Sequence, residues 1–172
     1  MLRLAIVLAA LLVQGVVAVA AAAPLDFAGT WRGTVQHHDP GIEAPQGEVV
    51  LVVTPSSDRF SLRWTVPGGR TVESSFAPTK QPGVYRAEEG GMFSMFGRRS
   101  VGNPLADGQL LWAREAGDAL YVYTLTIDRT GRYGIDRLEF LRRGDALGVT
   151  LTRQSTGHEP RSMVANLQRV GS

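Results

Sequence analysis

Polar and apolar residues alternate along most of this chain after residue 25, with the period of two that is typical of β-strands. The clearest case is residues 60–66, where Phe60, Leu62, Trp64 and Val66 fall on one face and smaller polar or charged residues on the other. A strand of this kind has one buried and one exposed face. No segment after residue 25 shows the period of an amphipathic helix, so the pattern predicts an all-β protein.

Other segments share this character. Residues 49–53 are apolar on both faces, and residues 120–127 are rich in aromatic and β-branched side chains. The sequence predicts ten strands: Thr30–Gln36, Gly47–Thr54, Phe60–Val66, Thr71–Phe76, Val84–Glu88, Gln109–Arg114, Leu120–Asp128, Tyr133–Leu141, Ala146–Gln154 and Ser162–Val170.

Turn signals separate these strands at short, fairly regular intervals, which favours an antiparallel meander over β-α-β units. The tetrapeptide Gly-Asp-Ala-Leu begins at Gly117 and again at Gly144, and each copy precedes a predicted strand, so we interpret it as a hairpin device. A sheet of this size closes to remove its edges. We therefore expect residues 25–171 to form a single antiparallel up-and-down β-barrel of about 8 to 10 strands.

The N-terminal residues have the pattern of a secretory signal peptide. Arg3 precedes an apolar run, and the small residues Ala18 to Ala23 offer cleavage sites. We expect residues 1–22 to be a signal peptide, cleaved between residues 20 and 23, and the protein to be secreted or periplasmic. The alternative is a permanent membrane anchor, because the apolar run approaches the length of a membrane span.

Composition removes several function classes. The chain has no cysteine, which excludes disulfides, a lipid-modified N-terminal cysteine, thiol catalysis and cysteine metal sites. Its 18 basic and 16 acidic residues nearly balance, and no basic cluster is interleaved with aromatic residues. We therefore do not expect a nucleic-acid partner.

The start and end of the predicted barrel carry a further pattern. Gly29-Thr30-Trp31 begins the first strand, and Arg153 and Arg169 lie near the end of the chain. Gly-x-Trp followed by an antiparallel meander and a late arginine resembles the calycin superfamily, which includes lipocalins, fatty-acid-binding proteins and bacterial lipocalin-like proteins. The resemblance implies that Trp31 closes one end of the barrel and that Arg153 or Arg169 packs across its face.

The same resemblance raises haem binding, because some ten-stranded lipocalin-like proteins hold haem through a histidine near the last strand. The last predicted strand contains no histidine, and the nearest, His158, lies in the preceding turn. One histidine fixes no metal by itself, so the sequence implies no cofactor and no metal.

The stretch GGMFSMFGRR, residues 90–99, is apolar and lies in a long predicted loop. Three readings remain open for Met92, Phe93, Met95 and Phe96: they pack into the core, form an apolar lid over the barrel, or contact a membrane or partner with residues 92–99. As further candidates to orient the polar end of a ligand, the sequence offers three aromatic residues: Trp112, Tyr121 and Tyr123.

Catalytic patterns are sparse. His37, His38 and Asp39 follow the first predicted strand in a long loop, and neighbouring strand residues diverge, so the two histidines do not easily share one ion. No Gly-x-Ser-x-Gly elbow, phosphate loop or dinucleotide fingerprint is present. On the eighth strand Asp136 and Glu139 have Arg137 and Arg142 as expected surface partners.

Three hypotheses follow. The first is a lipocalin-like protein that holds a small apolar or amphipathic molecule non-covalently inside the barrel. The second is an enzyme that uses the barrel as a pocket, with His37, His38 or His158 as acid or base. The third is a filled barrel that serves as an interaction module of the cell envelope.

Overall fold

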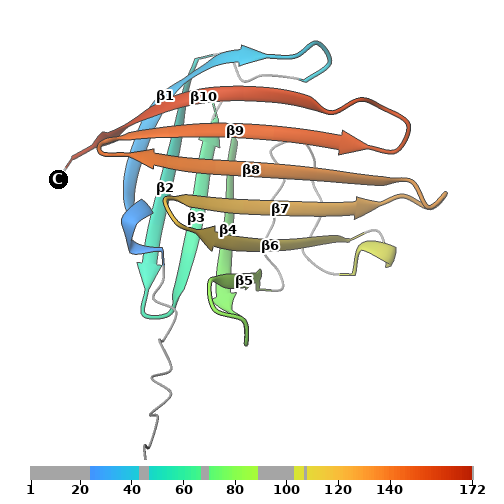
Figure 1. Cartoon of the computed structure of the whole chain (residues 1–172), viewed down its shortest axis with the longest axis horizontal. Helices are drawn as coiled ribbons and strands as arrows, with labels where there is room; N and C mark the ends of the chain where they lie inside the picture. The colour runs from blue at the N-terminus through green and yellow to red at the C-terminus, as the bar shows by residue number, and fades with distance from the viewer. Residues whose placement is uncertain (1–23, 43–46, 67–69, 89–102, 107, 172) are drawn as a thin grey trace, which may run out of the picture.

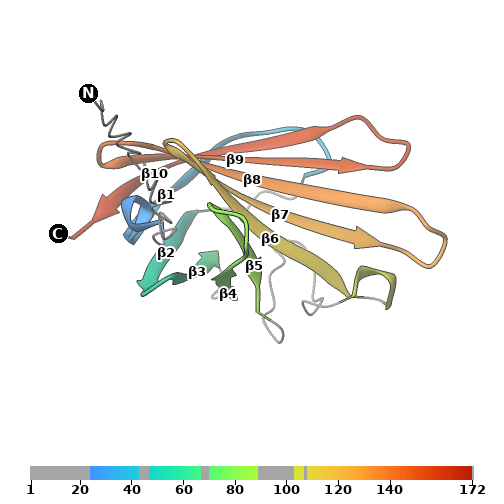
Figure 2. The same cartoon turned by 60° about the horizontal axis from the view of Figure 1, so that its bottom comes forward.

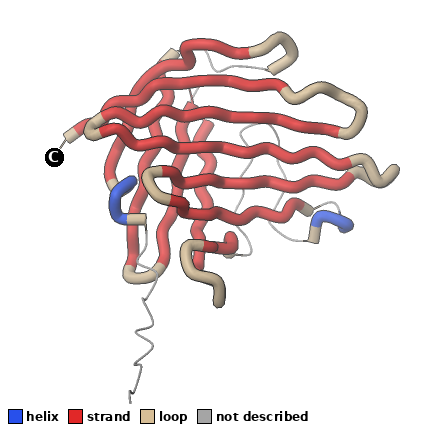
Figure 3. Tube along the Cα trace, in the orientation of Figure 1, coloured by secondary structure: helices blue, strands red, loops and turns tan. Residues whose placement is uncertain are grey.

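This computed structural model of the chain describes residues 24–42, 47–66, 70–88, 103–106 and 108–171. The described strands form one closed antiparallel barrel in up-and-down order, in which β1 also pairs with β10 (Figure 1). Two short 3-10 turns, η1 (Leu25–Phe27) and η2 (Pro104–Ala106), accompany the strands (Figure 3). The strands are β1 (Gly29–His38), β2 (Glu48–Ser56), β3 (Arg59–Val66), β4 (Arg70–Pro78), β5 (Val84–Ala87), β6 (Gln109–Ala116), β7 (Ala119–Ile127), β8 (Tyr133–Arg143), β9 (Ala146–Ser155) and β10 (Arg161–Val170).

The prediction of a single antiparallel up-and-down barrel is confirmed, and each predicted strand boundary lies within two residues of the observed one. One difference concerns the histidines. His37 and His38 belong to β1, where they pair with Val164 and Met163 of β10, and not to the loop after it. The predicted signal peptide, residues 1–22, lies outside the described residues. No helical segment among the described residues has the length and apolarity needed to cross a membrane.

The two halves of the barrel cross each other steeply. In Figure 1, β2, β3 and β4 run from top to bottom while β6 to β9 run from side to side, and Figure 2 shows the same two groups from another direction. β1 curves from the first direction into the second. A register shift between Val35 and His37 and the small residue Gly33 lie on this curved strand, as is common where a barrel strand bends.

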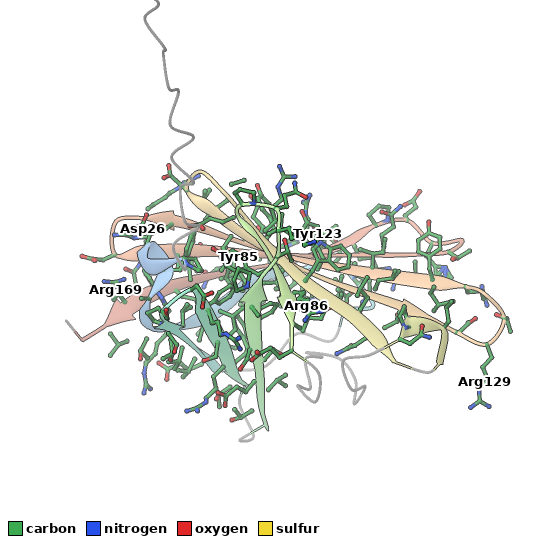
Figure 4. The ribbon with its side chains drawn as sticks, turned by 90° about the horizontal axis from the view of Figure 1, so that it is seen from below. Asp26, Tyr85, Arg86, Tyr123, Arg129 and Arg169 are labelled. Atoms are coloured by element: carbon green, nitrogen blue, oxygen red, sulfur yellow. The ribbon has the colours of Figure 1, made fainter. Side chains whose placement is uncertain are left out.

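The barrel has two distinct ends. In an up-and-down barrel alternate connections lie at the same end, so the turns after β2, β4, β6 and β8 share one end with η1, which we call the η1 end. β1, β3, β5, β7 and β9 end at the other, which we call the distal end. Figure 4 shows Asp26 and Arg169 at the η1 end and Arg129, from the turn after β7, at the distal end. The turn η1 lies beside the turns at Gly117 and Gly144.

The two Gly-Asp turns explain the repeated tetrapeptide. Gly117 joins β6 to β7 and Gly144 joins β8 to β9, and both have positive φ values, of 58° and 62°. Glycine adopts this conformation without steric cost, which suits it to tight hairpins. The prediction that the tetrapeptide is a hairpin device is therefore confirmed.

Candidate functional site

The inner face of the barrel is apolar and aromatic at the η1 end. Because strand side chains alternate, the buried residues of each strand identify its inward face. Phe60 stacks on Phe76 with 4.8 Å between ring centroids, and Tyr85 meets Phe60 edge-on at 5.1 Å. The large side chains buried in this part of the barrel are Phe27, Trp31, Phe60, Phe76, Tyr85 and Phe140.

Trp31 closes the η1 end together with η1 and the last strand. Its Nε1 donates a hydrogen bond to the Phe27 carbonyl oxygen at 2.9 Å. The Arg169 guanidinium lies over the indole, 4.9 Å from the ring centroid, and its Nη2 donates to the Ala28 carbonyl oxygen at 2.6 Å. Of the two candidate arginines, the structure places Arg169 on Trp31 and Arg153 elsewhere. A Cβ atom built on Gly29, which has a φ of 129°, would lie 3.6 Å from Arg169 Nε.

A tyrosine and a carboxyl group face each other inside this half of the barrel. The Tyr85 hydroxyl lies 3.5 Å from a Glu115 carboxylate oxygen. Burial, aided by the neighbouring Glu115 charge, raises the pKa of Tyr85 to about 12. Burial is also the main cause that raises the pKa of Glu115, opposed by its hydrogen bond with Tyr85. Both groups therefore hold their protons more tightly than they do in water.

Polar side chains face inward toward the distal end. Asp136 of β8 and Arg153 of β9 share the inward face of their strands with buried leucines, and they form two parallel hydrogen bonds of 2.8 and 2.7 Å. The hydrogen bonds to Asp136 raise the pKa of Arg153, against a smaller opposite effect of burial. Thr124 of β7 and Gln109 of β6 are buried on the same inner face. The interior thus changes from aromatic to polar along the barrel axis.

The expected surface ladder on β8 is partly wrong. Arg137 does lie near Glu139, at 3.8 Å, but Asp136 pairs with Arg153, and Arg142 lies 3.5 Å from Asp26. The physical reason is strand phase, since Asp136 has the same parity as the buried Leu138. This internal ion pair was not predicted from the sequence, although the parity of apolar positions on β8 and β9 indicates that Asp136 and Arg153 face inward.

The predicted ligand-contact residues fall into two groups. Met92, Phe93, Met95 and Phe96 lie outside the described residues. Trp112, Tyr121 and Tyr123 are described, and each is flanked in its strand by buried inward residues, so the structure places all three rings on the outer face.

On the outer face these rings form a row with arginines at its ends. Trp112 stacks on Tyr123 with 5.0 Å between centroids and an interplanar angle of 8°. In the strand register Trp112 pairs with Arg86 of β5, and Tyr123 pairs with Arg137 of β8. The row thus crosses four neighbouring strands and is a cross-strand ladder of the kind that stabilises sheets.

The three histidines are exposed at the distal end. His37 Nε2 lies 3.6 Å from an Asp39 carboxylate oxygen, and His38 Nδ1 lies 3.4 Å from the Asp39 carbonyl oxygen. His158 lies in the turn between β9 and β10. Within the described part of the chain, no group of three or more potential ligands is arranged to hold a metal ion.

Asp39 connects the end of β1 to β10 by hydrogen bonds. Its Oδ2 accepts hydrogen bonds from the Ser162 backbone N–H at 2.6 Å and from the Ser162 hydroxyl at 3.0 Å. The hydrogen bond from the Ser162 backbone lowers the pKa of Asp39, with further contributions from the Ser162 hydroxyl and His37. The folded state therefore favours the ionised carboxylate.

We expect this contact to make stability depend on acid pH. Because the Asp39 pKa is lower in the folded state, its contribution is complete above the unfolded-state pKa and is lost as the pH falls through the folded-state pKa. Asp39→Asn should lower the free energy of unfolding near neutral pH and flatten its decline below pH 4 or so. Urea unfolding curves measured across this range test the expectation.

Asp58→Asn is the matched control. Asp58 is exposed, and its one ion-pair contact among the described residues is with Arg59, at 3.9 Å. It should change neither the neutral-pH stability nor the acid slope appreciably. Equal behaviour of the two variants would contradict the role assigned to Asp39.

No protein-family model, curated protein or solved structure matches this chain. The architecture itself, an all-antiparallel closed barrel of ten strands, is compatible with a calycin-like fold.

Proposed function

We propose that this chain is an exported, lipocalin-like member of the calycin superfamily whose barrel holds a small amphipathic molecule without a covalent bond. The observation that carries the proposal is the graded inner face. Aromatic residues fill the η1 end, and Thr124, Gln109 and the Asp136–Arg153 pair face inward toward the distal end. An apolar wall with a few placed polar groups is typical of small-molecule sites.

Two further features support the assignment. The stacking of Arg169 on Trp31 at the start of the barrel is the arrangement that the resemblance to calycins implies. The N-terminal residues have the pattern of a signal peptide, which supports export. The lid reading of residues 92–96, and membrane contact through residues 92–99, stay predictions.

The first test is to identify a retained molecule. The mature protein is purified from its native envelope in the folded state, extracted with organic solvent, and the extract is analysed by mass spectrometry. We expect one amphipathic compound in stoichiometric amount. Extracts that stay empty in repeated preparations of folded protein would favour the filled barrel.

A fluorescence titration gives an independent answer. In Trp112→Phe the outer indole is removed, so energy transfer to the neutral dye N-phenylnaphthylamine comes only from Trp31 and Trp64, both buried. We expect saturable transfer with one dye molecule per barrel. Transfer that does not saturate, together with an empty extract, would overturn the proposal.

A further inference from the structure

Two buried polar groups of the inner wall have no hydrogen-bond partner among the described residues. They are the indole Nε1 of Trp64 on β3 and the hydroxyl of Ser74 on β4. Trp64 is 2% exposed and Ser74 is 1% exposed, so water in bulk does not reach them. An unpaired buried donor costs about 1 to 3 kcal/mol, and native proteins therefore contain few of them.

The two residues are close neighbours on the same face of the sheet. β3 and β4 are neighbours, with Leu62 opposite Ser74 and Trp64 opposite Val72. Trp64 and Ser74 are thus diagonal neighbours, at a spacing of roughly 7 to 8 Å between backbones, which long side chains bridge. Both share the parity of the buried Phe60 and Phe76, so both face the barrel interior.

The hydrogen-bonding capacity of Trp64 and Ser74 determines which ligand group would be complementary to them. An indole N–H only donates, and a serine hydroxyl can donate as well as accept. An oxygen with two lone pairs, as in a carbonyl group, can accept from both at once. A ligand that supplies such an oxygen satisfies two groups that have no partner among the described residues.

The surroundings favour an uncharged acceptor. Apart from these two residues, the described inward side chains on β2, β3 and β4 are hydrocarbon. A carboxylate placed against this wall would lose its hydration without gaining a cation from the side chains that the structure describes here, which is costly. Arg153, on β9, already forms two hydrogen bonds with Asp136. The inward residues of the wall are Val49, Leu51, Val53, Phe60, Leu62, Val72 and Phe76.

We infer that Trp64 and Ser74 form a subsite for an uncharged acceptor oxygen, and that the ligand is an apolar molecule bearing a carbonyl group of the ketone, ester or amide type. This inference rests on the proposed function, because it names the ligand class of the same interior. The subsite consists of Trp64 on β3 and Ser74 on β4.

The test compares three probes of equal chain length: a long-chain methyl ketone, the alkane and the fatty acid. Each displaces N-phenylnaphthylamine from the protein at pH 7. We expect the ketone to bind more tightly than the other two. Ser74→Ala and Trp64→Phe should each weaken ketone binding about three- to tenfold, the effect of one net hydrogen bond, and Ser74→Ala should leave alkane binding unchanged.

The chain offers matched controls for both variants. Ser75→Ala changes the next residue of β4, which points outward, and Trp112→Phe changes the outer indole. Neither should alter the preference for the ketone. Ser74→Ala should also leave the stability of the ligand-free protein unchanged or raise it, because it removes a buried hydroxyl that has no partner among the described residues.

The outcomes separate the two proposals. If the dye binds but ketone and alkane have equal affinities, and Ser74→Ala changes neither affinity, the subsite is overturned. A bound water would then satisfy the two groups. Tightest binding of the fatty acid would overturn the uncharged acceptor. A Ser74→Ala variant that loses stability and weakens alkane and ketone equally would assign Ser74 a structural role. Failure of the dye and all three probes to bind would overturn the proposed function itself.

Discussion

Gly33→Ala is expected to prevent the barrel from closing. A Cβ atom built on Gly33 would lie 1.9 Å from the Asn166 carbonyl oxygen and 2.9 Å from the Leu167 Cα, both in the backbone of β10. Neither atom belongs to a flexible side chain, so the β1–β10 pairing must separate to admit a methyl group. We expect a loss of more than about 3 kcal/mol in the free energy of unfolding, large enough to unfold many domains. Circular dichroism and urea unfolding measure it.

Gly148→Ala is the control for this prediction. Gly148 of β9 lies opposite the same Asn166, from the other side of β10. The nearest neighbour of its added Cβ among the described residues is the Leu141 carbonyl oxygen at 3.7 Å, an ordinary contact. This variant should keep the fold and nearly the wild-type stability. If Gly33→Ala is as stable as Gly148→Ala, β1 does not approach β10 as closely as the structure shows.

Trp31→Ala should cause the second large loss. The side chain is fully buried, its Nε1 hydrogen bond to Phe27 holds η1, and its ring supports the Arg169 guanidinium. Truncation of a buried aromatic residue to alanine costs about 3 to 5 kcal/mol, and the lost contacts of η1 and Arg169 add to the effect. Urea unfolding followed by circular dichroism measures the change without relying on tryptophan fluorescence.

Trp112→Ala serves for comparison, because it removes the same side chain from the outer face. Trp112 is only partly buried and keeps one side of its ring against Tyr123. We expect a smaller loss, of about 1 kcal/mol, from the stacked pair. Equal losses from the two variants would contradict the closing role of Trp31.

The fold was largely predictable from the sequence because period-two alternation and Gly-Asp turns are local signals. Residues 60–66 alternate so regularly that their strand and its inward face follow from the sequence alone. The end of β1 was harder to predict. The register shift near Gln36 extends the strand through His38, and it depends on pairing with β10, which is far away in sequence.

The contacts of the interior side chains were harder to predict from the sequence, because they also depend on pairing between strands. Alternation tells which residues share a face, but the partner of Asp136 depends on the register between β8 and β9. That Trp64 and Ser74 have no hydrogen-bond partner among the described residues is also a property of the assembled wall, since both residue types occur widely in ordinary strands. Strand phase alone would have placed Trp112, Tyr121 and Tyr123 outside, because each alternates with the apolar residues Leu111, Ala113, Leu120 or Val122.

The pairing of β1 with β10 has a consequence for the order in which the chain folds. Every other strand pair joins neighbours in the sequence, and most of these pairs form early because their loops are short; the long connection between β5 and β6 is the exception. Joining Trp31 to Arg169 closes a loop that spans nearly the whole domain, so its entropic cost falls on one late step. Until β10 arrives, β1 and β9 each present an unpaired edge that can bind another chain. We therefore expect this protein to aggregate most readily while its last strand is still undocked.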